Sequence, residues 1–389
     1  MRIGVNARLL NKPFTGIGRY TKALFSDLAQ EHPNDTFVLV AHEDVAGDFP
    51  KNVEVVILPE RFPGTAGMKK TFWEQVQLPA FFKKMGVDII HYPYPSNPWR
   101  NFKIPTVVTV HDTIPWVLPE YREQLSTRLY QDRCRNALKY ASLISAVSHA
   151  TKNDLVSLFP PLDNKIFVAE NGISSEYKSS VENAEKVLKK YNIDPARPYF
   201  LYLGGYDARK NVSLLVDVFR ESVASDFDVD LVLAGGKILQ GKLYESYDYA
   251  VEASKKMPES RGKLVFPGFI DEADLPVLYA HSLTFVNLSK AEGFNLPVIE
   301  ALCSGTPVIA SDIEIHHEVL GDYGHFVGVD DKVKLTEILR KFAGDVEFAS
   351  SERAKTEAYV CPFTWQKTAQ KVYQAYEKVM QFATIKRDI

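Results

Sequence analysis

Two glutamates, Glu292 and Glu300, are the residues of this 389-residue chain whose spacing most clearly suggests chemistry. They stand eight residues apart in the segment Glu292-Gly-Phe-Asn-Leu-Pro-Val-Ile-Glu300, and the first lies in a Gly/Asn/Pro loop. We expect a helix to begin in this segment, to carry Glu300 about a turn from its start and to end at Gly305. The start of a helix presents unpaired N–H groups and a partial positive charge, so an anion such as a diphosphate fits in front of it. The carboxylates can accept hydrogen bonds from hydroxyls of a sugar and a ribose.

The elements that must position this loop read as buried parallel strands. Short β-branched-rich runs alternate with helix-length segments, which is typical of parallel sheets covered by helices on both faces. The expected strands of the first half are 3–6, 37–41, 53–58, 87–91, 107–111, 143–147 and 166–169. Those of the second half are 199–203, 231–234, 264–266, 283–287, 307–310 and 325–329. The number of strands and the chain length predict an α/β protein with two Rossmann-like domains.

The domain boundaries follow from the polar stretch 174–192, which begins after Asn171-Gly172 and reads as the linker region. We place an N-terminal domain at 1–175 and a C-terminal domain at 176–365. Phe363-Thr-Trp365 opens an amphipathic segment, which predicts a final helix over about 366–389.

Two segments of the first half end strands with residues suited to a ligand. Thr15-Gly-Ile-Gly-Arg-Tyr20 places Gly16 and Gly18 at a strand-to-helix turn, where glycine permits close backbone approach, although a tight turn alone is the alternative. Arg19 could hold an acceptor phosphate, and the alternative is a solvated arginine on the surface. His111 and Asp112 end a strand, and the carboxyl ends of parallel strands point into the ligand crevice. A structural role is the alternative for His111, and Asp112 is expected to cap or orient.

Two segments of the second half suit a nucleotide. Gly204 and Gly205 precede Arg209-Lys210, adjacent cations that match a diphosphate, with surface solvation as the alternative. Gly268 and Phe269 follow another strand and read either as a turn against a base or as a generic loop.

These motifs, taken together over nearly the full length, resemble those of retaining glycosyltransferases of family 4, which use nucleotide-sugar donors. The resemblance implies the GT-B architecture, in which two Rossmann-like domains face a central cleft and the last helix crosses back onto the N-terminal domain. It implies that Glu292 holds hydroxyls of the transferred sugar and Glu300 those of the ribose. Arg209 and Lys210 would neutralise the diphosphate, with the backbone of Gly293, Phe294, Asn295 and Leu296 assisting. His111 would touch the sugar, and the first glycine loop, including Arg19 and Tyr20, would lie near phosphate and acceptor.

The chain departs from the family pattern at two positions. Gly205 stands where many members have an arginine, and Asn295 stands where the family usually has glycine. Asparagine is the non-glycine residue that best tolerates a left-handed backbone, so we expect the loop to keep its shape.

The chemistry implied is retaining glycosyl transfer. No second carboxylate faces the glutamates across the sugar as retaining hydrolases require, so we expect same-face attack with the leaving phosphate taking the acceptor proton. No Asp-X-Asp motif flanked by strands is evident, and we therefore predict no cofactor and no metal. The loops look most like bacterial mannosyltransferases of lipopolysaccharide or capsule assembly, which suggests GDP-mannose; UDP-hexoses and dTDP-deoxysugars remain alternatives.

The expected acceptor is a saccharide or lipid-linked saccharide at the cytoplasmic face of the membrane. A patch of aromatics and lysines would suit peripheral contact there, or alternatively belongs to a core-facing helix with lysines reaching outward: Phe62, Lys69, Lys70, Phe72, Trp73, Phe81, Phe82, Lys83 and Lys84. No apolar run approaches the ~20 residues of a membrane span, and the first strand begins too early for a signal peptide. We therefore expect a cytoplasmic protein.

Composition supports a soluble globular protein, with 46% hydrophobic and 24% charged residues. The net charge of −3 gives no case for nucleic acid. Three distant cysteines predict neither a disulfide framework nor a metal site. Rival hypotheses are another enzyme of this architecture, such as a phosphorylase or epimerase, and a non-catalytic sugar-nucleotide-binding partner of a glycosylation complex.

Overall fold

The computed structural model describes residues 1–12, 15–45, 47–100, 102–121, 125–178, 183–236, 246–257 and 261–385. The chain forms two compact units: unit 1 comprises Met1–Gly172 with Phe363–Ile389, and unit 2 comprises Ile173–Pro362. These junctions lie three residues from the boundaries predicted at 175/176 and 365/366.

Unit 1 contains a seven-stranded sheet in the order β3-β2-β1-β4-β5-β6-β7, with every neighbouring pair parallel. Its strands are β1 (Arg2–Asn6), β2 (Thr36–Ala41), β3 (Val53–Ile57), β4 (Ile89–Tyr92), β5 (Thr106–Val110), β6 (Leu143–Ala146) and β7 (Ile166–Val168). Its α-helices are α1 (Gly16–Glu31), α2 (Ala66–Phe72), α3 (Leu78–Met85), α4 (Ile114–Val117), α5 (Leu125–Tyr140), α6 (His149–Leu158) and α15 (Trp365–Ile385). Short turns of helix are η1 (Arg8–Asn11), η2 (Trp73–Gln77), η3 (Pro119–Tyr121) and η4 (Pro160–Lys165).

Unit 2 contains a six-stranded parallel sheet in the order β10-β9-β8-β11-β12-β13. Its strands are β8 (Tyr199–Leu203), β9 (Asp230–Ala234), β10 (Leu264–Gly268), β11 (Thr284–Asn287), β12 (Val308–Ser311) and β13 (Gly324–Val327). Its α-helices are α7 (Ala184–Lys190), α8 (Val212–Ser222), α9 (Ser246–Ser254), α10 (Leu275–His281), α11 (Leu296–Cys303), α12 (Glu314–Leu320), α13 (Lys332–Gly344) and α14 (Val346–Glu357). Short turns of helix are η5 (Ser175–Lys178), η6 (Ala208–Lys210), η8 (Glu272–Asp274) and η9 (Gly321–Tyr323).

Alternation along the strands places apolar side chains on both faces of each sheet. In β2, Phe37 and Leu39 pack into one core with α1 and α15, while Val38 and Val40 pack into the opposite core with η2, α3 and α5. All thirteen predicted strands are present, and their ends differ from the prediction by at most two residues. The α/β prediction is confirmed.

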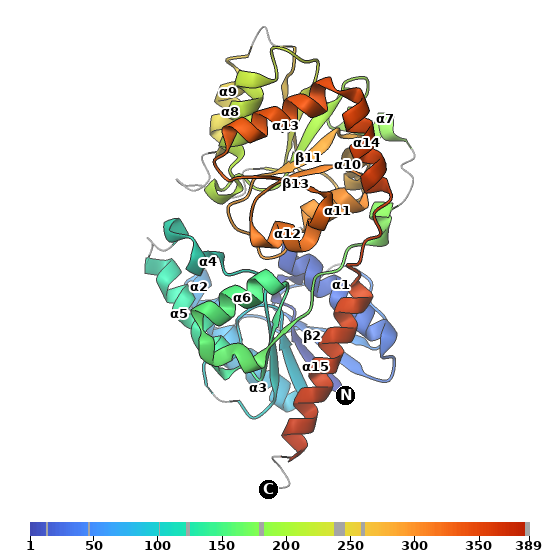
Figure 1. Cartoon of the computed structure of the whole chain (residues 1–389). Coiled ribbons are helices and arrows are strands. Elements are labelled where there is room, and N and C mark those ends of the chain that lie inside the picture. Colours follow the sequence, from blue (N-terminus) through green and yellow to red (C-terminus); the bar gives the residue numbers. More distant parts are fainter. Residues whose placement is uncertain are drawn as a thin grey trace. The chain divides into compact units, whose positions relative to one another are not determined.

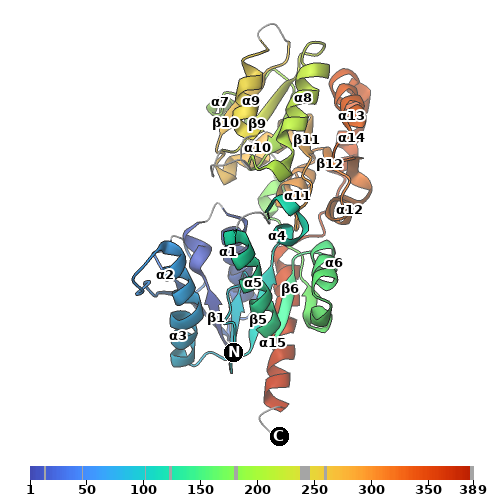
Figure 2. The same cartoon turned by 90° about the vertical axis from the view of Figure 1, so that its left-hand side faces the viewer.

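The final helix α15 packs on unit 1, although it follows the whole of unit 2 in sequence (Figures 1 and 2). Its apolar face, which includes Ala369, Val372 and Tyr376, enters the core formed by β1, β2 and α1. The prediction that this helix returns to the N-terminal domain is confirmed for residues up to 385; positions 386–389 lie outside the described residues.

The predicted interfacial patch is wrong for two of its aromatic residues. Trp73 and Phe82 have no exposed surface, and both pack in the core beneath α2, η2 and α3. The Trp73 indole donates a hydrogen bond of 2.7 Å to the Leu58 carbonyl, so its N–H group is satisfied within the protein. These positions therefore belong to a core-facing helical segment, with Lys83 and Lys84 exposed on its outer side. None of the helices in the described ranges has the length and apolar character needed to cross a bilayer.

Candidate functional site

The strand order of unit 2 reverses direction between β8 and β11. Connections from β8 run outward through β9 to β10, whereas β11 leads the other way through β12 to β13. In open parallel sheets, ligands bind outside the carboxyl ends of the strands at such a switch point. The loop after β8 carries Arg209 and Lys210, and the loop after β11 carries Glu292, so the topology brings these three predicted residues to one place.

Arg209, Lys210 and Glu292 form a compact ion cluster at this switch point. Lys210 donates to Glu292 Oε1, and Arg209 Nη1 lies 2.8 Å from the same oxygen. Arg209 Nε lies 2.9 Å from Asp207 Oδ1, and the Arg209 carbonyl accepts a 2.7 Å hydrogen bond from the Lys290 amide. The loops after β8 and β11 are therefore joined through both side chains and backbone.

The charges of the cluster balance, and burial amplifies their interaction. The side chains of Arg209, Lys210 and Glu292 are 17%, 12% and 9% exposed. Burial raises the pKa of Glu292, but attraction to Lys210 and Arg209 outweighs it and lowers that pKa to about 2. Burial lowers the pKa of Lys210, and the contact with Glu292 opposes that effect. The charges of the two cations are thus largely balanced by Glu292 and Asp207.

The loop that follows Glu292 has the backbone conformation that the sequence predicts. Asn295 is left-handed, with φ 64° and ψ 63°, and serves as the N-cap of α11. The helix ends at Cys303, and Gly305 follows with a positive φ of 75°. Both features confirm the predicted loop–helix–strand unit.

Glu300 lies inside the structure instead of facing solvent. Its side chain has no exposed surface, and Glu300 Oε2 accepts a 3.1 Å hydrogen bond from the Tyr279 hydroxyl of α10. Its helix α11 starts at the switch point, but the carboxylate packs beneath the surface. Contact between Glu300 and ribose hydroxyls stays a prediction.

The glycine turns after β8, β9 and β10 interlock at the same edge of the sheet. The Gly235 amide donates to the Gly268 carbonyl at 2.8 Å, and the Gly204 amide donates to the Ala234 carbonyl at 3.1 Å. A Cβ atom on Gly235 would lie 2.0 Å from the Gly204 carbonyl oxygen, so this approach requires glycine. Phe269, next to these turns, is 66% exposed, which leaves its ring accessible. Gly205 continues the turn after Gly204, and its carbonyl accepts a hydrogen bond from Tyr202.

In unit 1 the strand order reverses between β1 and β4. The glycine loop follows β1, and Thr15 caps α1 by accepting a 3.2 Å hydrogen bond from the Gly18 amide. A Cβ on Gly18 would lie 2.4 Å from the Lys12 carbonyl oxygen, so Gly18 serves close packing of the chain on itself. Gly16 is exposed with open space around its Cβ position, and Arg19 on the next turn is half-buried.

His111 directly follows β5, and its ring contacts the Pro93 carbonyl and the ring of Tyr20. Nε2 donates to the Pro93 carbonyl at 2.8 Å, so Nδ1 is the acceptor nitrogen of the neutral ring. Burial lowers the pKa of His111 to about 4, which keeps the imidazole neutral near pH 7. Asp112 accepts a 3.1 Å hydrogen bond from the Ile114 amide at the start of α4, in line with the expected capping role.

Tyr20 is placed differently from its prediction as an acceptor contact. Its side chain is buried, its ring meets His111 edge-on with 4.7 Å between centroids, and its hydroxyl lies 3.0 Å from Thr109 Oγ1. The residue therefore supports His111 and has no surface left for a saccharide.

A cavity of about 110 Å³ in unit 1 was missed by the sequence reasoning. It lies beside α2, η2, α5 and the segment after β4, and it is lined by Lys70, Glu74, Trp99, Tyr130, Arg133 and six other residues. Glu74 is buried and accepts a 2.6 Å hydrogen bond from Tyr94, while burial raises its pKa. Arg133 lies over the Trp99 ring. No local motif reveals this site, because its residues come from segments far apart in sequence.

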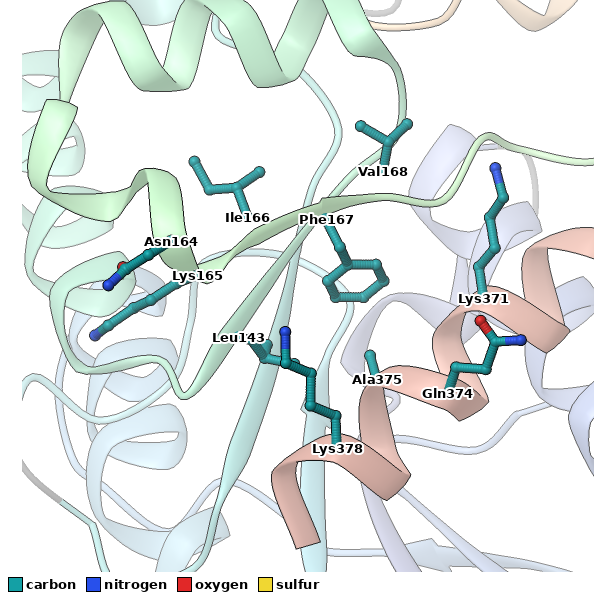
Figure 3. A pocket seen from close by; sticks show the side chains of 10 residues that line it. All are labelled: Leu143, Asn164, Lys165, Ile166, Phe167, Val168, Lys371, Gln374, Ala375 and Lys378. Atoms are coloured by element: carbon teal, nitrogen blue, oxygen red, sulfur yellow. The ribbon is translucent and has the colours of Figure 1, made fainter. Parts of the chain in front are cut away.

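A second cavity lies between the edge strand β7 and α15 (Figure 3). Lys165 borders it on one side, and Lys371 and Lys378 border it on the other. Lys165 donates to two backbone carbonyls and Lys371 pairs with Glu170, so two of these lysines serve the fold. None of the predicted site residues lines this groove.

A doubly-wound parallel sheet in each of two units is the layout of the GT-B class of glycosyltransferases. Two family models match the chain: Glycosyltransferase Family 4 over residues 14–177 and Glycosyl transferases group 1 over residues 183–359. The two matches together cover most of the chain, which belongs to family 4 of the glycosyltransferases.

Several relatives of this chain are bacterial mannosyltransferases. The O-antigen chain mannosyltransferase B of Escherichia coli is 28% identical over 284 residues, which cover 71% of this chain and 72% of the relative. The O-antigen chain mannosyltransferase RfbU of Salmonella typhimurium is 26% identical over 341 residues, covering 84% of this chain and 87% of the relative. The serotype-specific mannosyltransferase WbdA of Escherichia coli is 23% identical over 75% of this chain, which spans only 35% of WbdA.

Solved structures share the fold over nearly the whole chain. Sucrose-phosphate synthase from Thermosynechococcus elongatus matches with a TM-score of 0.77 at 19% identity, covering 98% of this chain and 99% of that one. Anabaena HepE in complex with UDP and glucose matches with a TM-score of 0.70 at 18% identity, covering 97% and 99%. These similarities show the GT-B fold, with a Rossmann-like parallel sheet in each of the two units.

Proposed function

We propose that this glycosyltransferase transfers mannose from GDP-mannose to a saccharide or lipid-linked saccharide, with retention of configuration, in cell-surface polysaccharide synthesis. The observation that carries the proposal is the cluster of Arg209, Lys210 and Glu292 beside the start of α11. Cations and helix N–H groups together suit a diphosphate, and the neighbouring carboxylate suits a sugar. The O-antigen mannosyltransferases among the relatives favour mannose.

In the proposed reaction, the donor diphosphate takes over the contacts that Arg209 and Lys210 make with Glu292. Glu292, released from these partners, then accepts hydrogen bonds from hydroxyls of the mannose. Bond cleavage develops negative charge on the departing phosphate, and the two cations with the first amides of α11 stabilise it. The departing phosphate oxygen takes the acceptor proton, while the acceptor oxygen bonds to the sugar carbon on the same face. In this mechanism His111 is the neutral group assigned to contact the sugar and to stabilise positive charge at the reacting carbon.

For the acceptor, we propose the cavity lined by Lys70, Glu74 and Trp99 in unit 1. An aromatic ring offers its face to the C–H groups of a pyranose, and a carboxylate and an ammonium group bind its hydroxyls. Trp99→Ala and Glu74→Gln should raise the acceptor KM at least fivefold and leave the donor KM unchanged. Tyr140→Ala is the control, since Tyr140 is exposed on the same helix α5 but lies outside the cavity.

The donor is tested by calorimetric titration with GDP, UDP and dTDP and then with their sugars. GDP binding that Lys210→Ala weakens supports the proposal. Selective UDP binding would favour a UDP-hexose donor, the alternative for which the UDP complex of HepE gives a specific precedent. Nucleotide binding without turnover on any acceptor would favour a non-catalytic partner of a glycosylation complex.

We further propose that the protein works in the cytoplasm, at the inner face of the membrane where a lipid-linked acceptor would lie. The exposed Lys83 and Lys84 and the stacked pair Phe62 and Phe72 remain from the predicted patch. Flotation with anionic liposomes tests this placement, and protein that stays entirely in the unbound fraction would contradict it.

A further inference from the structure

A chain of buried polar side chains lies beneath the loop that carries Glu292 in unit 2, and none of the roles proposed above uses it. Its side chains come from the carboxyl ends of the adjacent strands β11 and β12, from the loop before α11 and from α12, and the backbone carbonyl of Ser289 completes it: Asn287, Asn295, Ser311 and His316, with Ser289. All five are buried, and His316 has no exposed surface. A buried polar group without hydrogen-bond partners costs free energy, so such a chain is kept only where its contacts are made.

The hydrogen bonds fix which nitrogen of His316 carries the proton. His316 Nδ1 lies 2.8 Å from the Ser311 carbonyl oxygen, which can only accept, so Nδ1 carries the hydrogen. Burial lowers the pKa of His316 to about 4, so the ring is neutral near pH 7 and Nε2 is an acceptor. Asn295 Nδ2 lies 2.8 Å from that Nε2 and therefore donates to it. The Ser311 hydroxyl in turn donates to the Ser289 carbonyl.

Because of these contacts, the Asn295 side chain does not make the hydrogen bond that is usual for an N-cap residue. An asparagine at this position commonly accepts a hydrogen bond from the second or third helical N–H group. Here the side chain makes no such cap bond to α11. Its Nδ2 faces His316, and its Oδ1 lies 3.5 Å from Asn287 Nδ2. The side chain is thus turned into the protein, away from the N–H groups at the start of the helix.

The same contacts hold a backbone that asparagine adopts at a cost. A φ of 64° is disfavoured for any residue with a Cβ atom, and asparagine tolerates it better than other side chains without being free of strain. The family pattern has glycine at this position, which needs no such support. The loop in this chain therefore depends on side-chain anchoring where glycine would supply conformational freedom.

We propose that His316 is a positioning residue for glycosyl transfer: through its hydrogen bond with Asn295 it fixes the left-handed turn that presents the start of α11 and Glu292 to the donor diphosphate. The inference rests on the proposed donor site and adds to it the residue that keeps the loop in shape. His316 itself touches neither substrate in this assignment.

The test is a double-mutant cycle between His316→Ala and Asn295→Gly, with donor KM, kcat and nucleoside diphosphate affinity as readouts. We expect His316→Ala to weaken donor binding about tenfold. Asn295→Gly should stay within about threefold of wild type, because glycine adopts the turn unaided. The double variant should match Asn295→Gly alone, so that the two effects are coupled. An equal tenfold loss from His316→Ala in both backgrounds would overturn the proposal.

A conservative variant and a matched control separate positioning from general stability. His316→Gln keeps an acceptor oxygen near the position of Nε2 and should retain most of the donor affinity of the wild type. This variant also provides the test if His316→Ala fails to fold. His325→Ala removes a partly buried histidine of unit 2, whose partner is Glu352, and should leave donor KM unchanged. The assignment would be refuted if His316→Gln bound the donor no better than His316→Ala. It would also be refuted if His325→Ala raised donor KM as much as His316→Ala does. Wild type that binds none of GDP, UDP and dTDP would refute the proposed donor site instead.

Discussion

Lys210 donates a hydrogen bond to Glu292 from 82 residues away in the sequence, across the point where the strand order of unit 2 reverses. Arg209 reaches the same carboxylate oxygen at 2.8 Å. A carboxylate that two cations hold in common is both anionic and fixed in place, and the pKa of Glu292, lowered to about 2 despite burial, agrees with this. The pairing gives the site a resting state whose charges are already balanced before any donor arrives.

Replacing Lys210 by alanine should lower kcat/KM by roughly 30- to 1000-fold. The ammonium group is expected to contribute about 2–4 kcal/mol of charge-assisted stabilisation to the departing diphosphate. Steady-state kinetics with a fixed acceptor measures the effect, and a loss below fivefold would exclude the assigned role. Lys255→Ala is the matched control, because Lys255 forms an exposed ion pair with Glu252 on the protein surface and such pairs contribute little.

The stability contributed by His316 should depend on pH in a defined window. An unfolded histidine has a pKa near 6.5, whereas burial lowers the pKa of folded His316 to about 4. As the pH falls from about 6.5 to 4, the unfolded state binds a proton that the native state refuses, and the native state loses up to about 3 kcal/mol. Above pH 6.5 the stability contributed by neutral His316 is fully present.

The variant His316→Gln isolates the pH-dependent stability that His316 contributes, because glutamine does not titrate. Urea unfolding of both proteins at pH 7, 6 and 5 should show wild type losing stability relative to the variant as the pH falls. A constant difference across this range would mean that His316 titrates alike in both states.

The parts of the site that local sequence determines were predictable. The left-handed turn at Asn295 and the helix stop at Gly305 follow from the backbone conformations that asparagine and glycine tolerate. Arg209, Lys210 and Glu292 could be assigned to one edge because each follows a recognisable strand, and parallel strands bring their carboxyl ends together.

The parts that depend on tertiary packing were not predictable. Glu300 reads as a helix residue near a ligand, yet it is buried against Tyr279, a partner 21 residues earlier on another helix. Tyr20 reads as part of a ligand loop, yet the helical period turns its ring into the core. His316 follows a strand beside His317, and nothing local shows that one histidine is buried while the other is exposed. Side-chain direction and distant partners decided each case.

Turnover is expected to be independent of divalent metal. In the proposed mechanism, Arg209 and Lys210 supply the positive charge that a metal ion would otherwise bring to the diphosphate. Enzyme dialysed against EDTA and assayed in chelated buffer should keep its full rate. Loss of turnover on chelation, with recovery on addition of Mg²⁺ or Mn²⁺, would contradict the prediction.

Replacing Tyr376 by phenylalanine should lower the free energy of unfolding by about 1–3 kcal/mol, because it leaves a buried polar atom of His91 without its partner. The Tyr376 hydroxyl of α15 lies 2.6 Å from His91 Nδ1, and His91 Nε2 lies 2.8 Å from Thr109 Oγ1. Thr109 also contacts Tyr20, whose ring supports His111, so the returning helix is linked through the core to a predicted site residue.

Tyr373→Phe is the control on the same helix. Tyr373 donates a 2.8 Å hydrogen bond to Asp35 from a partly exposed position, where water can replace the lost partner. Its loss should therefore destabilise the protein less than the loss of the Tyr376 hydroxyl, as measured by thermal or urea unfolding. If Tyr376→Phe proves no more destabilising than Tyr373→Phe, the buried chain from α15 to Tyr20 does not stabilise unit 1, and the helix is held by its apolar face alone.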